Sequence, residues 1–224
     1  MRMSLRADHL SFAYSDGQVV LNDLCFELMP GELHFIVGAN GCGKSTLLHC
    51  LSTNESTAFL PQTIQPSQRF SVREAVELGA RTSGHSNIED LMLQLDIKHL
   101  AQRDLDQLSG GEYQRVLVAS VLAERSNFLL LDEPSSSLDL HHQVHLFRIL
   151  KSFCAEGLGI AVVCHDWNIA SRYADTISIL HDGEILDSGT PQKVITSTNL
   201  TTLFGNDVVI IKINNLPVVV PANE

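Results

Sequence analysis

The sequence has few basic residues and no long apolar run. Lys and Arg together number 15 against 26 Asp and Glu, so the 224-residue chain has a formal net charge of −11. Nucleic acids and anionic lipid surfaces are both bound largely through basic side chains, so this balance argues against either partner. No apolar stretch approaches the roughly 18 residues that span a bilayer, and residues 1–20 lack a signal-peptide core. We therefore expect a soluble, cytosolic protein with one sizeable core that does not bind nucleic acid.

One glycine-rich stretch carries the strongest chemical pattern. Residues 38–46 read Gly-Ala-Asn-Gly-Cys-Gly-Lys-Ser-Thr, after an apolar run at 33–37 and before Leu47 and Leu48. A strand, a glycine-rich turn and a helix in this order are typical of a P-loop, whose backbone N–H groups and helix N-terminus converge on phosphate oxygens. We expect Lys44 to reach the β- and γ-phosphates and the Ser45 hydroxyl to coordinate Mg²⁺. The expected nucleotide-binding residues of the loop are Gly38, Asn40, Gly41, Cys42, Gly43, Lys44, Ser45 and Thr46.

Cysteine is sparse, and its pattern predicts no disulfide framework. The five cysteines are odd in number and include no C-x-x-C pair, which is typical of reduced thiols in a cytosolic protein. Cys42 differs because it lies inside the P-loop, close to a helix N-terminus and Lys44. An accessible thiol there would have a lowered pKa. The alternative, which we favour, is that Cys42 is a small residue filling a tight turn.

A second pair of glycines lies at the predicted start of a long helix. Ser109 and Glu112 have the spacing of a capping box that opens a helix running to about Arg125. Gly110 and Gly111 leave the N–H groups of its first turn uncovered, which favours phosphate binding. An ordinary capped helix would explain Ser109 and Glu112 but not both glycines.

Two further strands deliver polar side chains to one sheet edge. The apolar run at 129–131 ends in Asp132 and Glu133, and the run at 160–164 ends before His165. Such runs predict buried parallel strands, whose carboxyl ends meet at the same edge. In a P-loop protein Asp132 is expected to hold Mg²⁺, Glu133 to act as general base, and His165 to contact the γ-phosphate.

Other segments predict a mixed α/β chain with no internal repeat. A capping box is expected at Ser71 and Glu74, and another at Ser86 and Glu89. Tyr14 lies in a turn, where it is either a base-stacking aromatic or a plain turn residue. His141 and His145 are spaced i,i+4, but without a further ligand we expect a solvated helix face. The expected strands are 5–12, 19–28, 58–60, 176–180, 184–188, 208–213 and 216–220, and the expected helices are 45–51, 72–80, 88–95, 140–155, 190–197 and 199–204.

Taken together and in order, these motifs resemble those of ATP-binding-cassette (ABC) ATPases over nearly the whole chain. The resemblance implies an α/β fold with a P-loop NTPase (RecA-like) core. It implies a core of 1–62 plus 106–205, a helical subdomain at 63–105 and a closing β-hairpin at 206–224, all within one domain. It also implies the following roles: Walker A for Gly38–Thr46, Q-loop for Gln62, signature for Leu108–Gln114, Walker B for Leu129–Pro134, D-loop for Ser136–Asp139, H-loop for His165 and adenine stacking for Tyr14.

The same resemblance implies a division of labour among these residues. Catalysis is assigned to Lys44, Gln62, Glu133 and His165, and Mg²⁺ to Ser45, Gln62 and Asp132. In a homodimer, each ATP would be sandwiched between the P-loop of one copy and Ser109, Gly110, Gly111 and Asp139 of the other. A separate membrane permease would dock on the helical subdomain and Gln62, at the cytoplasmic face of the membrane, and a periplasmic or surface binding protein would act indirectly.

More narrowly, the chain resembles the ATPases of iron-siderophore, haem and vitamin B12 importers. The stretches that carry this likeness are His165–Asn168, Ala174-Asp175, Asp182-Gly183, Gly189–Pro191, Leu203–Val208 and Val218–Pro221. Two departures stand out. The stretch between Lys44 and Gln62 is short, which predicts a reduced antiparallel β part and raises the question of a lower ATPase rate. The signature also has Glu112 where Gln is usual, and a capping box accepts either.

Three alternatives share this chemistry. A chromosome-maintenance or DNA-repair ATPase would need a long coiled-coil insertion before the signature, and only a short helical segment is present. A regulatory or ribosome-binding ATPase usually carries two cassettes in one chain, and the acidic balance disfavours RNA. A cassette that binds ATP without turnover is the third, suggested by the short stretch after Lys44. The substrate itself is not encoded in this chain.

Overall fold

A six-stranded sheet forms the centre of the molecule. The computed structural model describes residues 4–62, 70–81 and 87–222. The strands lie in the order β4 (Thr57–Leu60), β5 (Phe128–Asp132), β6 (Gly159–Val163), β3 (Leu33–Val37), β7 (Thr176–His181) and β8 (Glu184–Gly189). The first five are parallel, and β8 runs antiparallel to β7. Strands β3, β5 and β6 are buried along their whole length, which explains their unbroken apolar sequences.

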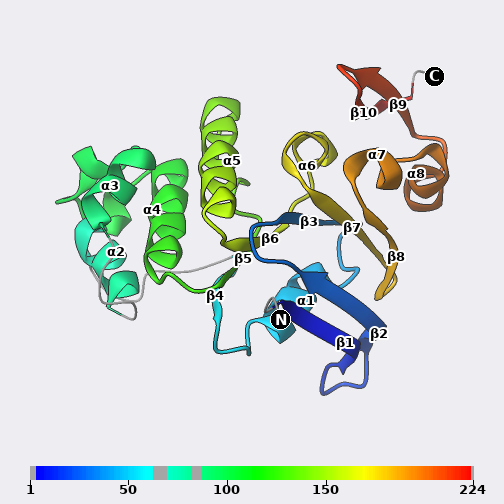
Figure 1. The fold of residues 1–224 in the computed structure, drawn as a ribbon, viewed down its shortest axis with the longest axis horizontal. Helices are drawn as coiled ribbons and strands as arrows, with labels where there is room; N and C mark the ends of the chain where they lie inside the picture. The colour runs from blue at the N-terminus through cyan, green and yellow to red at the C-terminus, as the bar shows by residue number, and fades with distance from the viewer. Residues whose placement is uncertain (1–3, 63–69, 82–86, 223–224) are drawn as a thin grey trace.

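The two faces of this sheet bury different side chains. Phe35 packs toward a cluster shared with α4 (Gly110–Ala123), α5 (Leu140–Ala155) and α6 (Trp167–Tyr173). Ile36 packs toward a second cluster with α1 (Lys44–Leu51) and the separate two-stranded sheet of β1 (Leu5–Ala13) and β2 (Val19–Leu28). Figure 1 shows these layers, with β1 and β2 on the side of α1. The predicted α/β fold with a P-loop NTPase architecture is confirmed.

Helices α2 (Val72–Ala80) and α3 (Ile88–Gln94) gather around α4 at one end of the molecule (Figure 1). A Cβ on Gly79 would lie 1.9 Å from the Ser120 carbonyl oxygen, so only glycine permits this close crossing of α2 and α4. Ser71 and Glu74 form the expected capping box. The expectation for α3 was wrong, because its N-cap is Asn87, which accepts a hydrogen bond from the Asp90 N–H. Ser86 lies outside the described residues.

Short elements precede α4 and follow β8. Two 3₁₀ turns, Lys98–Leu100 and Leu105–Gln107, lead from α3 to α4. After β8, α7 (Pro191–Val194) and α8 (Ser197–Phe204) precede a hairpin of β9 (Val208–Ile213) and β10 (Leu216–Pro221). Asn214 and Asn215 both have positive φ, as a two-residue hairpin turn requires.

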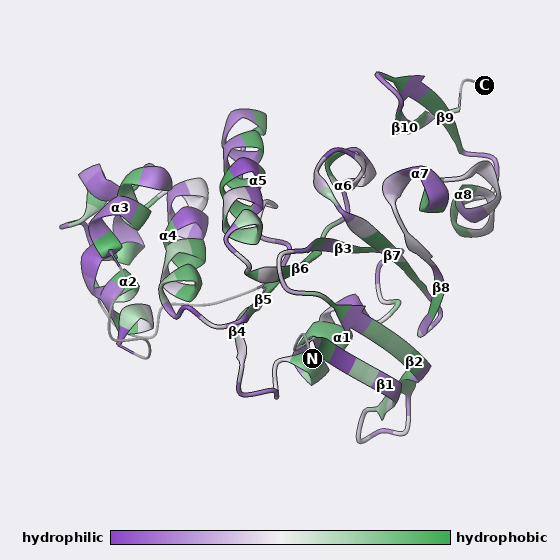
Figure 2. Cartoon of the chain, in the orientation of Figure 1, coloured by the Kyte–Doolittle hydropathy of each residue, from purple (hydrophilic) through white to green (hydrophobic). Residues whose placement is uncertain are grey.

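The hairpin is fixed to α6 by side chains of that helix. The Asn168 amide donates to the Val219 carbonyl at 3.1 Å and accepts from the Val219 N–H at 2.8 Å, while the Ser171 hydroxyl donates to the Pro217 carbonyl. Figure 2 shows the aliphatic character of these strands at the end of the molecule opposite α2 and α3. Within the part of the chain that the structure describes, no helix has the length and apolar character needed to cross a membrane.

Candidate functional site

The loop between β3 and α1 has the geometry of an anion site. Gly43 is the N-cap of α1 with φ 106°, and no side chain caps the helix there. A Cβ on Gly43 would lie 2.8 Å from Leu21 Cδ2 and 3.0 Å from the Val20 carbonyl oxygen, so β2 requires glycine at this position. The helix start is therefore left open to a ligand, with its N-terminal partial positive charge exposed.

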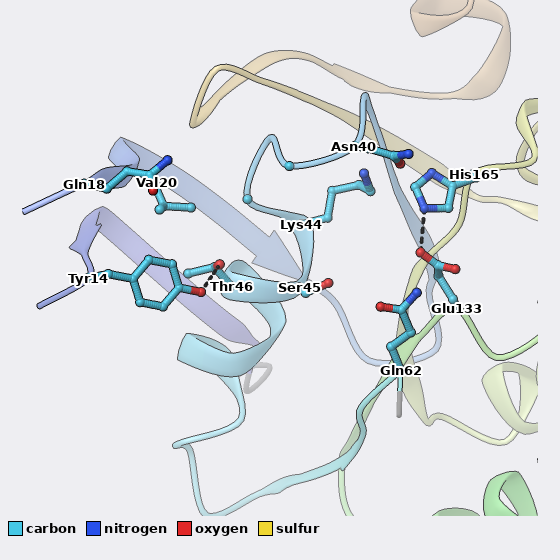
Figure 3. Close-up of a pocket in the computed structure, with 12 residues that line it drawn as sticks. Tyr14, Gln18, Val20, Asn40, Lys44, Ser45, Thr46, Gln62, Glu133 and His165 are labelled. Atoms are coloured by element: carbon cyan, nitrogen blue, oxygen red, sulfur yellow. Dashed lines mark hydrogen bonds and ion pairs between the residues drawn. The ribbon is translucent and has the colours of Figure 1, made fainter. Parts of the chain in front are cut away.

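Lys44 lies inside the curve of this loop. Its ammonium donates to the carbonyl oxygens of Gly38 at 3.0 Å and Ala39 at 2.7 Å, and its side chain is buried. An open pocket of about 790 Å³ spreads in front of it (Figure 3). Its lining consists of Tyr14, Gln18, Val20, Asn40, Gly41, Gly43, Lys44, Ser45, Thr46, Gln62, Glu133 and His165.

Tyr14 marks one end of this pocket (Figure 3). Its ring is 51% exposed, packs edge-to-face on Phe12 at 5.2 Å, and its hydroxyl lies 3.3 Å from Thr46 Oγ1. An aromatic face held in this way can stack on a nucleotide base. Gln18 and Val20, which the sequence reasoning missed, line the same end. Their only signal was their position at the start of the strand that follows Tyr14.

Asp132 is buried at the end of β5, and its surroundings suit a cation. The residue is 2% exposed, and its Oδ1 has no hydrogen-bond partner. Burial raises the pKa of Asp132, while the Ser45 hydroxyl acts in the opposite direction. A buried carboxylate oxygen left unpaired beside a serine hydroxyl is a donor set that fits Mg²⁺, which prefers oxygen ligands. The fit rests on these two side chains, with Gln62 nearby in the pocket lining.

Glu133 and His165 meet at the other end of the pocket. His165 Nε2 lies 2.5 Å from Glu133 Oε1, and the two residues follow the C-terminal ends of the adjacent strands β5 and β6. Glu133 has φ 52°, an uncommon conformation for a residue with a side chain, and its N–H donates to the Val163 carbonyl. In Figure 3 the Gln62 amide lies on the same side of the pocket as Glu133. This arrangement can hold a water molecule for deprotonation.

Six of the expected nucleotide ligands lie outside this pocket lining: Gly38, Cys42, Ser109, Gly110, Gly111 and Asp139. Ser109 and Glu112 form a reciprocal capping box, and the start of α4 packs against the segment that precedes α5. A Cβ on Gly110 would lie 3.7 Å from Ser137 Cβ, and one on Gly111 would lie 3.3 Å from the Ser137 carbonyl oxygen. Asp139 caps α5 by accepting from the His142 N–H at 2.9 Å.

The structure bears on two expectations about side-chain chemistry. Cys42 is buried, and burial raises its pKa despite the nearby Lys44, which supports the favoured alternative of a small residue filling a tight turn over an accessible, acidified thiol. His141 is exposed, as a solvated helix face requires, while the half-buried His145 also donates from its Nε2 to the Gln94 carbonyl at 2.6 Å. Gly38 is also buried beneath the loop rather than in the pocket lining.

Known proteins match the chain over most of its length. A family model described as ABC transporter matches residues 21–136. The hemin import ATP-binding protein HmuV of Aliivibrio fischeri is 34% identical, with 91% of each chain covered. HmuV of Rhizobium meliloti is also 34% identical, with 90% of this chain and 91% of the relative covered. The alignment with the Aliivibrio protein spans 238 positions, more than the 224 residues present here, so that relative carries segments without a counterpart.

Solved structures give the same result for the fold. A chain of a structure described as an inward-facing conformation of a metal-chelate type ABC transporter superposes with a TM-score of 0.84 at 26% identity, and 98% of this chain and 97% of that chain are covered. An ATP-binding cassette of another ABC transporter, 19% identical, shares the fold with a TM-score of 0.79 over 91% of this chain and 99% of its own. The chain therefore belongs to the ABC transporter family, as an ATP-binding and ATP-hydrolysing member.

Proposed function

We propose that this chain is the ATPase subunit of an importer for an iron-siderophore, haem or cobalamin-type compound. The observation that carries the proposal is the separation of two phosphate-binding parts. The P-loop pocket opens at one edge of the central sheet, while the bare helix start at Ser109–Gly111 lies outside its lining. One chain thus offers half of each of two sites, and a second copy completes both.

Within one copy, the P-loop and α1 hold the triphosphate from one side. Lys44 neutralises charge on the β- and γ-phosphates. Ser45, Asp132 and Gln62 are the residues that would hold Mg²⁺, which when bound supplies positive charge beside the phosphoryl oxygens. Tyr14 stacks on the base. These contacts bind and orient ATP but leave the outer face of the γ-phosphate uncovered.

Glu133 and His165 carry the chemical step in this proposal. Glu133 accepts the proton of the attacking water, because its carboxylate faces the pocket from the end of β5. His165 holds that carboxylate in place through the 2.5 Å contact and reaches toward the γ-phosphate. The strained φ of Glu133 fixes the direction of its side chain further.

The second copy supplies the remaining contacts. Ser109, Gly110 and Gly111 present N–H groups at the start of α4, where the helix dipole favours an anion. Asp139, in the segment packed beside these glycines, lies at the same junction. ATP then holds the two copies together, and loss of the γ-phosphate lets them part, which is a ligand-driven population shift.

Two comparisons support import as the process that this cycle drives. The curated relatives are hemin import ATP-binding proteins, and the structure with a TM-score of 0.84 is described as metal-chelate type. The region of α2 and α3, together with Gln62, is the proposed docking surface for a helix of a separate permease. The chain would then sit at the cytoplasmic face of the membrane through that permease, and a substrate-binding protein would act indirectly.

The test is a nucleotide-dependent dimer of Glu133→Gln. This variant should retain ATP binding, lose hydrolysis by roughly 10²–10⁴-fold, and form a dimer with ATP and Mg²⁺ on size-exclusion chromatography with light scattering. A matched control is Glu133→Gln combined with Gly110→Asp. A Cβ at position 110 meets only Ser137, at an ordinary contact distance, so the variant should fold. Its new carboxylate would repel the γ-phosphate of the ATP that is bound in the P-loop of the other copy. A dimer that forms equally well in both variants, or in neither, contradicts the sandwich.

A hydrolysis-impaired cassette is the second candidate. It is favoured by the short connection from α1 to β4, which adds no further antiparallel strand. The antiparallel sheet near the site therefore consists of β1 and β2. Phosphate release from Mg²⁺-ATP, with Lys44→Ala as the blank, separates the two. A rate equal to the blank, with ATP binding intact and the permease present, would favour the impaired cassette.

A further inference from the structure

Three potential metal ligands converge at the start of α5. Asp139, His141 and His142 each offer a carboxylate oxygen or imidazole nitrogen, and these atoms all lie within 4.8 Å of one another. Asp139 Oδ1 lies 2.9 Å from His142 Nδ1, and the two imidazole rings are 5.3 Å apart between centroids. Asp139 and His141 are exposed and His142 is half-buried, so the cluster is open to solvent.

The donor set selects a class of ion. Two imidazoles and one carboxylate suit Zn²⁺ and related first-row transition metals, whereas Mg²⁺ and Ca²⁺ prefer oxygen alone. With Zn–N and Zn–O bonds of about 2.1 Å, ligand atoms of a tetrahedral site are roughly 3.4 Å apart. The 2.9 Å pair is about half an ångström closer than this spacing, and the His141 ligand atom lies within 4.8 Å of both, so small side-chain rotations bring the three atoms to it.

We propose that Asp139, His141 and His142 form a binding site for a transition-metal ion of the Zn²⁺ class, with a fourth position open to water or another ligand. The site does not include His145, the i,i+4 partner of His141, whose imidazole is engaged by the Gln94 carbonyl. The positive end of the α5 dipole opposes a cation, but this first turn is exposed and the effect is screened by water. The Asp139 carboxylate supplies compensating negative charge.

The position of the site couples it to the nucleotide cycle. Asp139 ends the segment whose Ser137 packs against Gly110 and Gly111 at the start of α4. In the dimer proposed above, Asp139 and these glycines face the second copy. A metal ion that engages the Asp139 carboxylate and both imidazoles withdraws that side chain from the interface, so its occupancy lowers ATP turnover.

The binding test uses the full chain without nucleotide, so that its outcome does not depend on the proposed dimer. Zn²⁺ is titrated calorimetrically into the wild-type chain, His141→Ala and the double variant with His142→Ala. The wild type binds one ion at this site, and each variant weakens that event by at least about tenfold. The matched control is His99→Ala, which removes an exposed histidine paired with an i,i+3 aspartate, Asp96, and with no third ligand grouped beside it among the described residues. Unchanged Zn²⁺ affinity and stoichiometry in the double variant would overturn the site.

A second measurement tests the coupling. Phosphate release with Mg²⁺-ATP is followed as Zn²⁺ is added. The wild type and His99→Ala lose activity, whereas His141→Ala, which lies outside the ATP-binding residues, keeps its rate at the same Zn²⁺ concentration. Equal inhibition of all three would place the inhibitory ion elsewhere and refute the coupling.

Discussion

The Asp132 carboxyl is buried, although the charged form of a carboxyl is more stable in water. Its carboxyl is buried with one oxygen unpaired, and burial raises its pKa. A carboxyl with a higher pKa in the folded than in the unfolded state makes the free energy of unfolding fall as pH rises through the folded pKa. At neutral pH the charged side chain therefore destabilises the protein until a cation pairs with it.

Asp132→Asn should accordingly stabilise the chain and remove its response to Mg²⁺. We expect the melting temperature without Mg²⁺ to rise by roughly 2–4 °C per kcal/mol gained, and the stabilisation by Mg²⁺-ATP to shrink. Differential scanning fluorimetry at neutral pH measures both. Asp106→Asn, which neutralises an exposed carboxyl, serves as the control. A lower melting temperature for Asp132→Asn would refute the argument.

Glu32 shows the opposite effect at the start of β3. Burial by itself would raise its pKa, but the nearby His34 imidazole, the Thr176 hydroxyl and a hydrogen bond from the Met29 N–H outweigh burial and bring the pKa to about 2. Its stabilising contribution is therefore complete above the unfolded pKa near 4.5 and is lost as pH falls toward 2.

Glu32→Gln tests this contribution. We expect the variant to lose about 2 kcal/mol of unfolding free energy near neutral pH, measured by urea denaturation. The difference from wild type should shrink steadily once the pH falls below about 4.5. Asp106→Asn, which neutralises an exposed carboxyl, is again the control and should leave the unfolding free energy nearly unchanged. A difference that stays constant with pH would show that packing, and not charge, explains the loss.

At the scale of elements, the C-terminal hairpin depends on α6. An isolated two-stranded sheet is marginal in water, and Asn168 satisfies both backbone groups of Val219. We expect Asn168→Ala to cost about 1–3 kcal/mol and to speed amide hydrogen exchange across residues 208–221. Asp106→Asn, an exposed change before α4, should leave exchange there unaltered. Equal protection of the hairpin in both variants would mean that its apolar contacts suffice.

The elements that could be predicted from the sequence are those bounded by local signals. The expected bounds Val19–Leu28, Val72–Ala80, Leu140–Ala155 and Val208–Ile213 are those found. Each is bracketed by a turn or a capping residue, which acts within a few positions of the chain. The prediction of the α3 N-cap was wrong for a related reason. Ser86 and Asn87 are both good capping residues with acids nearby, and the sequence alone does not rank them.

What could not be predicted depends on distant neighbours. The position of β3 between β6 and β7 is set by packing of whole strands. The raised pKa of Cys42 follows from burial beneath the loop, which the motif does not encode. The same limit applies to the cluster of Asp139, His141 and His142, because the sequence predicted only a solvated helix face there, whereas the cap of α5 brings His142 beside Asp139.

At the scale of the whole molecule, the acidic charge bears on the proposed dimer. Two copies with a formal charge of −11 each must approach one another, and like net charges slow association. We expect the ATP-bound Glu133→Gln dimer to tighten as NaCl rises from about 10 mM to about 0.1 M, because the Debye length falls from roughly 30 to roughly 10 Å. Analytical ultracentrifugation across this range gives the dissociation constant.

The salt effect on nucleotide binding must be separated from the effect on dimerisation. ATP affinity is measured at the same salt concentrations in the Glu133→Gln, Gly110→Asp variant, which is expected to remain monomeric, and any change there is subtracted. Tighter dimers at higher salt then report net repulsion between the copies. Weaker dimers would mean that attraction between the phosphates and the opposing N–H groups at Ser109–Gly111 outweighs the repulsion, because screening acts on whichever charge interaction dominates the interface.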